Sequence, residues 1–439
     1  MKNDRVKQYK LLSDAYYGDG GFLNGEYLIK HIRESAEKFQ NRIDLSYYLN
    51  YTAPCVNAHV DPIFKRAPQR EYSGQLSQLW EDFAKDTDFA GSDLDTLSKS
   101  WALAAKLYGA AYVVCDNAPQ PGSTMAEMIA SKKRPYAYLL KPERIKEIKV
   151  NNYGKIIYFA FLERDPKTKK DFVRVFEQTG WHLIGDDGNV KDRGTYNLGR
   201  VPVIRLTSRE LSPFDMFPAS EFISIATTNR SIYNKCSWLD DILCNQTFSL
   251  LTYPTNKAED LTIGTDNALA YPPDSRHQPS FIAPPAESAN VLASQIESMR
   301  ESIYNMAVVV NVTGVRAQSS GVAKQWDFEQ TNQVLSSFAK SIGCAEMELA
   351  KVFALWLNTE FEYSSIYQKD FSVSDVSTEL ANAEVAKGLN FGEKFNLEVL
   401  KRVATSYLPD LKKDQIEEII SDYEQQIAQQ KLDAAHANV

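Results

Sequence analysis

Residues 225–243 read IATTNRSIYNKCSWLDDIL, and residues 292–310 read LASQIESMRESIYNMAVVV. In each stretch a stripe of residues recurs at alternating steps of four and three, which marks one narrow face of an α-helix. The first stripe is apolar apart from Asn229, and the second is apolar throughout. The pattern predicts two long helices, over about 218–248 and from about 288, that each pack on another helix. The eight stripe residues expected to make this packing are Ile225, Ile232, Leu239, Leu243, Leu292, Ile296, Met299 and Ile303.

The two helices flank a proline-rich insertion. Six prolines punctuate residues 252–287, so only short extended pieces are expected there, at 267–270 and 280–282. A polar stretch rich in small residues follows at 311–324, and a third long helix is predicted over about 326–360. The remaining residues are expected to be helical in three parts: 377–388, 393–405 and 412–434.

The N-terminal part begins with helical patterns. Residues 26–66 read as helix with a kink at Pro54, and residues 76–108 read as helix with a break near Gly91. Ser92 and Asp95 give a capping signal, and Gly109 ends the helix that starts at residue 94. The apolar run at 111–115 is expected to be a buried strand.

Between residues 134 and 206 the period changes to two. Turn residues such as the Asp187-Gly188 pair separate alternating runs, which is typical of hairpins. The sequence predicts one antiparallel meander of five or six strands, at 136–140, 145–150, 156–162, 172–176, 181–184 and 201–206.

Composition limits the class of protein. The chain has 439 residues and a net charge of −8, which argues against a protein that coats nucleic acid but not against one that DNA passes through. The first 20 residues lack a signal peptide, and the longest apolar run, at 306–312, is too short to cross a membrane. Five widely spaced cysteines favour free thiols in a reducing compartment. We therefore expect a soluble protein made in a cytoplasm.

No enzyme motif is present in the sequence. The glycines and lysine at 388–394 imitate a phosphate loop but are too closely spaced. Asp187-Gly188 fits a hairpin turn better than a calcium loop, and Asp240 and Asp241 point in different directions on a helix. The five histidines are scattered without ligand partners: His31, His59, His182, His277 and His436. The sequence thus predicts no catalytic, cofactor or metal site. Two arrangements of the long helices remain open: a helical bundle within one chain, or a ring in which they line a barrel between subunits.

Several short sequence motifs, and the order in which they occur, bear on the choice between a bundle and a ring. They are RIDLSYYLN at 42–50, VDPIFKR at 60–66, the Trp80 to Gly91 helix end, LYGAAYVVCD at 107–116, RPY at 134–136, PERI at 142–145 and SGVAK at 320–324. Together with the order of elements, they make nearly the whole chain resemble the portal proteins of tailed phages.

The resemblance implies an α+β portal fold and a set of parts. These are a wing of helices and antiparallel sheet (1–211), a first stem helix (212–250), a small clip (251–287), a second stem helix (288–310), a tunnel loop (311–325), a long wing or crown helix (326–360), and a crown with the C-terminal tail (361–439). It implies a non-enzymatic subunit without cofactor, twelve copies of which form a ring at one capsid vertex of a virion. The implied partners are the major capsid protein, the terminase large subunit, a head–tail adaptor and double-stranded DNA that passes non-specifically, with no membrane.

The charges and hydrogen-bond donors of the expected tunnel loop suit contact with phosphate. Arg316 and Lys324 are its only charges, and the side chains of Gln318, Ser319 and Ser320 can donate hydrogen bonds to phosphate. Residues 361–439 hold 14 Asp plus Glu and 8 Lys plus Arg, so most of the net negative charge of the chain lies in the expected crown. Ordinary surface roles for Arg316 and Lys324 remain open. Two other identities also remain open, namely a different ring-forming head–tail connector and a soluble helical enzyme with an unrecognised site.

Overall fold

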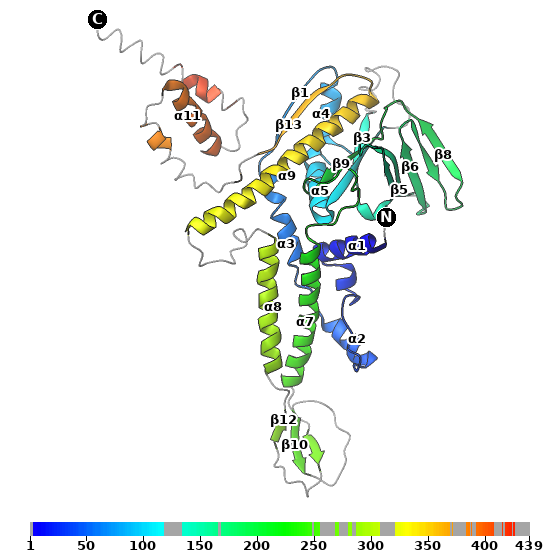
Figure 1. Ribbon diagram of the computed structural model, residues 1–439, viewed down its shortest axis with the longest axis vertical. Coiled ribbons are helices and arrows are strands. Elements are labelled where there is room, and N and C mark those ends of the chain that lie inside the picture. Colours follow the sequence, from blue (N-terminus) through cyan, green and yellow to red (C-terminus); the bar gives the residue numbers. More distant parts are fainter. Residues whose placement is uncertain are drawn as a thin grey trace. The chain divides into compact units, whose positions relative to one another are not determined.

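The computed structural model describes residues 3–117, 134–165, 168–247, 250–254, 268–271, 280–282, 287–307 and 321–368, and shorter stretches between 371 and 425 (Figure 1). The chain has two compact units, Met1–Lys369 and Asp370–Val439. A boundary after residue 360 is predicted from the sequence, and the first unit extends nine residues further, to Lys369. The reason is a strand, β13 (Glu362–Ile366), which pairs antiparallel with β1 (Gln69–Ser73).

The first unit begins with short helices rather than with the long kinked helix predicted over 26–66. They are α1 (Asn3–Tyr17), η1 (Gly20–Phe22), α2 (Ala36–Leu45), α3 (Thr52–Asn57) and η2 (Asp61–Phe64). Ser35 starts α2, because its hydroxyl accepts a hydrogen bond from the Lys38 amide. Pro54 lies in the first turn of α3, where a missing amide hydrogen is tolerated, so it does not kink a helix.

The next two helices lie where the sequence predicts helix, within residues 76–108. After α4 (Ser77–Lys85) comes α5 (Leu94–Tyr108), which ends at Gly109 as predicted. Gly109 has a φ of 90°, and a Cβ there would lie 3.1 Å from the Ala219 carbonyl oxygen. The N-cap is Asp93, whose carboxylate accepts from the Thr96 amide, rather than Ser92. The buried strand β2 (Ala110–Asn117) follows directly.

The predicted single meander is wrong, because its strands divide between two sheets. β2 is buried along almost its whole length and pairs on both edges, with β3 (Pro135–Leu140) and with β9 (Val203–Thr207). The other sheet is the meander β4 (Ile145–Val150), β5 (Ile156–Arg164), β6 (Asp171–Glu177), β7 (Gly180–Ile184) and β8 (Val190–Thr195). Tyr112 of β2 packs with Phe159, Phe161 and Phe176 of the meander in one buried cluster. β8 is polar and largely exposed, so no alternation revealed it.

The chain then forms a long hairpin, in which α7 (Ile223–Thr247) packs against α8 (Glu287–Met306). A small sheet lies between them in sequence, made of β10 (Leu250–Pro254), β11 (Ala268–Tyr271) and β12 (Ser280–Ile282). Helix α7 starts five residues later than predicted, because the Ser220 hydroxyl accepts from the Phe222 amide and forms a turn there. Helix α9 (Gly321–Trp356) starts five residues earlier than predicted.

The second unit contains α11 (Glu393–Tyr407), close to the helix predicted at 393–405. Of the other two helices predicted in this unit, residues 383–386, 388, 415, 418–423 and 425 are described, and all are helical.

Candidate functional site

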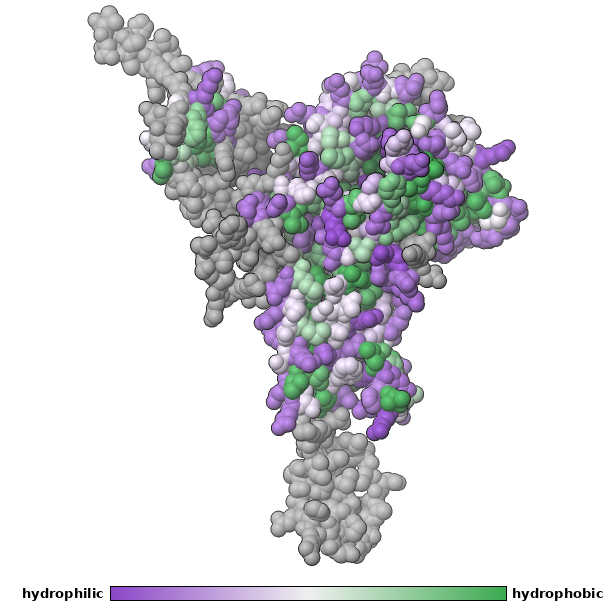
Figure 2. All heavy atoms as spheres, viewed as in Figure 1, coloured by the Kyte–Doolittle hydropathy of each residue, from purple (hydrophilic) through white to green (hydrophobic). Residues whose placement is uncertain are grey.

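The α7–α8 hairpin is the candidate site, because it carries the stripes on which the sequence analysis focused. At 1.5 Å per residue the two helices are about 37 and 30 Å long. Lys235 of α7 donates a hydrogen bond of 2.8 Å to Gln295 of α8. Figure 2 shows hydrophilic (purple), intermediate (white) and hydrophobic (green) residues interspersed over this hairpin, and further hydrophobic residues beside it, over α2.

The eight predicted stripe residues differ in burial. Ile225, Ile232 and Ile303 are buried within the chain, in the part of the hairpin away from the small sheet β10–β12. Leu239, Leu292, Ile296 and Met299 are half-buried, and Leu243 is 45% exposed. The stripes are therefore covered by their own chain at one end and less covered toward β10–β12. The bundle and ring arrangements are thus not mutually exclusive, since one chain covers only part of each stripe.

Asn229, the polar member of the first stripe, anchors α7. Its side-chain oxygen accepts from the Tyr48 hydroxyl at 2.7 Å, from the Tyr51 amide at 3.0 Å and from the Thr52 amide and hydroxyl at 3.2 and 3.1 Å. Its side-chain nitrogen donates to the Leu49 carbonyl at 2.8 Å. Asn229 is fully buried, so every one of these bonds is sheltered from water. The sequence singled this residue out without indicating its partners.

A second set of contacts ties residues 29–46 to α7. Arg42 is buried and donates to Glu34 at 2.9 and 3.0 Å, to the Ile29 carbonyl at 2.8 Å and to the Ser237 hydroxyl at 3.1 Å. The hydrogen bonds from Arg42 lower the pKa of the Glu34 carboxyl. Lys38 pairs with Asp241 at 3.0 Å. This segment is therefore held against α7 in one conformation.

The C-terminal end of α8 contacts a cluster of buried side chains. A ring nitrogen of His59, Nε2, lies 2.8 Å from the Ala307 carbonyl oxygen, and His59 also packs edge-on against Phe222. Lys106 is buried nearby, 3.4 Å from a Glu221 oxygen and 4.6 Å from the centre of the Phe338 ring. Burial, followed by the charge of Lys106, lowers the pKa of His59 to about 4. His59 is thus neutral at pH 7.

Glu346 of α9 is a buried carboxylate that accepts hydrogen bonds from five other residues. Arg70 donates to both of its oxygens. The hydroxyls of Ser98 and Tyr367 donate to Oε1, and those of Tyr363 and Ser365 donate to Oε2. Burial raises the pKa of this carboxyl, but the hydrogen bonds from Arg70 and the two serines outweigh it, so the pKa is lowered. A carboxylate with all its lone pairs occupied is a poor general acid or base, so the role of Glu346 is structural.

The remaining candidate residues from the sequence do not come together as a metal site within the described residues. Within the described residues no three His, Cys, Asp or Glu side chains gather as a metal site, and no helix is long and apolar enough to cross a bilayer. Asp187 and Gly188 form a turn in which Asp187 pairs with Lys191. Asp241 forms an ion pair with Lys38. All five cysteines are free, although two of them, Cys244 and Cys344, are exposed.

Most of the predicted tunnel loop lies outside the described residues. This applies to Arg316, Gln318, Ser319 and Ser320. Lys324 belongs to the first turn of α9, and its side chain is not among those described. The structure does describe the residues on either side of 308–320. Ala307 contacts His59, and Gly321 is the first residue of α9.

No family model and no curated protein matches the sequence. Among solved structures, a chain of the "Neck of native GTA particle computed with C12 symmetry" has a TM-score of 0.40 and 11% identity, with 80% of this chain and 88% of that chain covered. A chain of the "Neck of empty GTA particle computed with C6 symmetry" has a TM-score of 0.41 and 10% identity, covering 77% and 85%. A chain of the "Virion of native gene transfer agent (GTA) particle" has a TM-score of 0.42 and 11% identity, covering 77% and 86%.

Proposed function

We propose that this chain is a portal subunit, a structural protein that forms a ring at one vertex of a phage-like capsid. The ring is the channel through which double-stranded DNA is packaged and ejected. It also serves as a docking platform for the terminase large subunit and a head–tail adaptor, within a shell of major capsid protein. Twelve copies are the number that the resemblance of the sequence to phage portals implies.

The α7–α8 hairpin is the single observation that carries the proposal. Two long helices leave a sheet-containing body together, and a small sheet, β10–β12, joins them at the other end (Figure 1). An exposed hairpin with incompletely covered stripes buries them best against copies of itself. In this assignment α7 and α8 are the stem, β10–β12 belongs to the clip, and the second unit is the crown.

The DNA path follows from the position of residues 311–325 in the chain. These residues lie between the end of α8 and the first turn of α9, which contains Lys324, and in a ring each subunit would present them to the channel. Arg316 and Lys324 would touch phosphates, with hydrogen bonds from Gln318, Ser319 and Ser320, and would read no base. The anchoring of Ala307 by His59 would hold the base of this loop steady while DNA moves.

The purified full-length chain tests the proposal directly. Size-exclusion chromatography with light scattering should give a particle of roughly a dozen subunits, and negative-stain images should show rings with a central hole. A protein that stays monomeric or dimeric at all concentrations would refute the portal assignment.

A further inference from the structure

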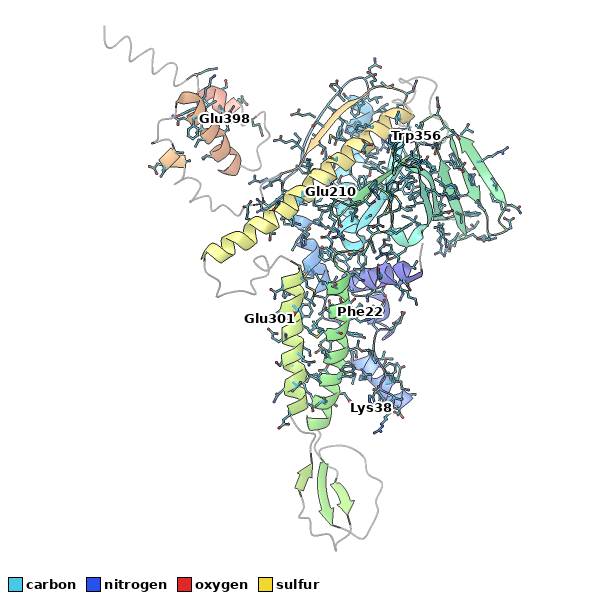
Figure 3. All side chains as sticks on the ribbon, viewed as in Figure 1. Phe22, Lys38, Glu210, Glu301, Trp356 and Glu398 are labelled. Carbon is cyan, nitrogen blue, oxygen red and sulfur yellow. The ribbon has the colours of Figure 1, made fainter. Side chains whose placement is uncertain are left out.

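Helix α7 separates two surfaces that face in nearly opposite directions. Ser237 contacts Arg42 and Ser46 on one side, whereas Lys235 contacts Gln295 of α8 on the other. Side chains two residues apart on an α-helix point about 160° apart. Residues 29–46 and α8 are therefore the two outer flanks of one layer with α7 in the middle, as Figures 1 and 3 show.

The flank formed by α8 is acidic. The helix turns its apolar stripe inward, and the opposite face carries Glu287, Glu297 and Glu301, all exposed. Figure 3 shows Glu301 on the side of α8 away from α7. With these three glutamates and a single cation, Arg300, the helix has a net charge of −2. Arg300 hydrogen bonds to Glu297. We call Glu287, Glu297 and Glu301 the acidic flank.

The start of the other flank, residues 29–33, combines cations with exposed apolar side chains, whereas residues 34–46 hold three acids and two cations. Residues 29–33 read IKHIR, with Lys30 and Arg33 exposed and no acidic residue. The side chains of Ile29 and Ile32 are 60% and 93% exposed, which is unusual for isoleucine. The Ile29 amide donates to Asn234 at 2.7 Å, so the backbone that presents these side chains is held in place. We call residues 29–33 the basic flank.

The two flanks lie at the same level along α7. Ile29 is bonded to Asn234, and Gln295 is bonded to Lys235, the next residue of the helix. Glu297 and Glu301 follow Gln295 on α8 by about 3 and 9 Å. Subunits of a closed ring are related by rotation with no rise along the axis, so surfaces that meet must lie at one level. These flanks meet that condition if α7 runs along the ring axis.

We propose that the acidic flank of one subunit docks on the basic flank of a second copy of this chain. Lys30 and Arg33 pair with Glu297 and Glu301 of the second copy, while Ile29 and Ile32 are covered by its α8. The contact joins two different surfaces, so it propagates head to tail, and it closes as a ring when the rotation between neighbouring subunits divides a full turn evenly. The inference rests on the proposed function, because the ring supplies the second copy.

Charge reversal on each flank tests this contact in the full-length chain. One variant carries Glu297→Lys with Glu301→Lys, a second carries Lys30→Glu with Arg33→Glu, and a third carries all four changes. A control variant reverses two exposed acids of the five-stranded sheet, Asp171→Lys with Asp192→Lys. Light scattering across a concentration series measures assembly, and negative-stain images identify rings.

Each two-residue reversal on a flank should raise the concentration needed for ring formation at least about tenfold, since like charges are brought together. The four-residue variant should recover ring formation to within about threefold of the unmodified chain, and the control should match that chain. Rings that survive both flank reversals would overturn this contact while leaving the portal assignment intact. Failure of the four-residue variant to recover, while the control assembles, would also overturn it. An unmodified chain that never forms rings would instead refute the proposed function.

Discussion

Arg70 of β1 donates hydrogen bonds of 3.1 and 2.8 Å to the two oxygens of Glu346 on α9, a residue 276 positions later in the chain. The same arginine lies 2.7 Å from Asp95 near the start of α5. The pair therefore joins three elements that are distant in sequence, and Glu346 has no exposed surface through which water could replace Arg70.

Glu346→Ala should lower the free energy of unfolding by about 3–5 kcal/mol, because it leaves Arg70 and several hydroxyls without their buried acceptor. Chemical denaturation followed by circular dichroism measures the change. Glu348→Ala is the matched control, since Glu348 makes only half-exposed ion pairs with Arg200 and Lys351 and should cost less than about 1 kcal/mol. Equal effects of the two variants would contradict the central role of Glu346.

His59 predicts a pH dependence of stability. Burial lowers the pKa of His59 to about 4 in the folded chain, from the ordinary value of 6.5 that applies on unfolding. Between these values the unfolded state binds the proton more readily, so stability falls as pH decreases from about 6.5 to 4. The loss is roughly 3 kcal/mol over that window, at 1.36 kcal/mol per pH unit. Unfolding measured across this range should show the slope, and His59→Gln should reduce it; an unchanged slope would argue against this cause.

Asn229→Leu should destabilise the chain by about 3 kcal/mol or more. The substitution keeps the number of heavy atoms in the side chain but removes its five hydrogen bonds. The Thr52 amide loses this acceptor, whereas the Tyr48 hydroxyl, the Tyr51 amide and the Leu49 carbonyl each keep one other hydrogen bond. Ser231→Ala, at an exposed position of the same helix, should change stability by less than about 0.5 kcal/mol. Thermal unfolding of both variants provides the comparison, and a well-tolerated Asn229→Leu would show that the hydrogen-bond hub is dispensable.

Arg316→Ala combined with Lys324→Ala should impair DNA packaging or retention while ring assembly stays normal. The two cations are the only charges of residues 311–325, so their removal leaves each subunit without a phosphate-attracting charge in this loop. The protected DNA per particle and the ring yield are measured in parallel. Normal packaging by the double variant would mean that these residues are ordinary surface charges.

Local signals predicted some elements accurately. Helix α5 lies at the predicted residues because Gly109 ends it and because its apolar positions keep a helical spacing. The stripe residues Ile225, Ile232 and Ile303 are buried, as a periodic apolar pattern indicates. Such information is carried by neighbouring residues and does not depend on the rest of the fold.

Other features depend on residues that are far apart in the chain. The placement of β9 beside β2 rather than in the meander is a choice of pairing partner, and alternation along one strand does not encode it. The partners of Asn229 come from residues 48–52, about 180 positions earlier. The sequence marked Asn229 as an exception within an apolar stripe, but only the fold supplies the hydroxyl and amides that explain it.

The pairing of β1 with β13 has a consequence for synthesis. Ser73 at the end of β1 meets Glu362 across 289 residues of sequence, so β1 has no ladder partner until α7, α8 and α9 have left the ribosome. During that interval α7 and α8 can be fully emerged while the body that anchors them lacks its β1–β13 pair. The closing of this strand pair therefore comes late in synthesis, after all three long helices of the first unit have been made.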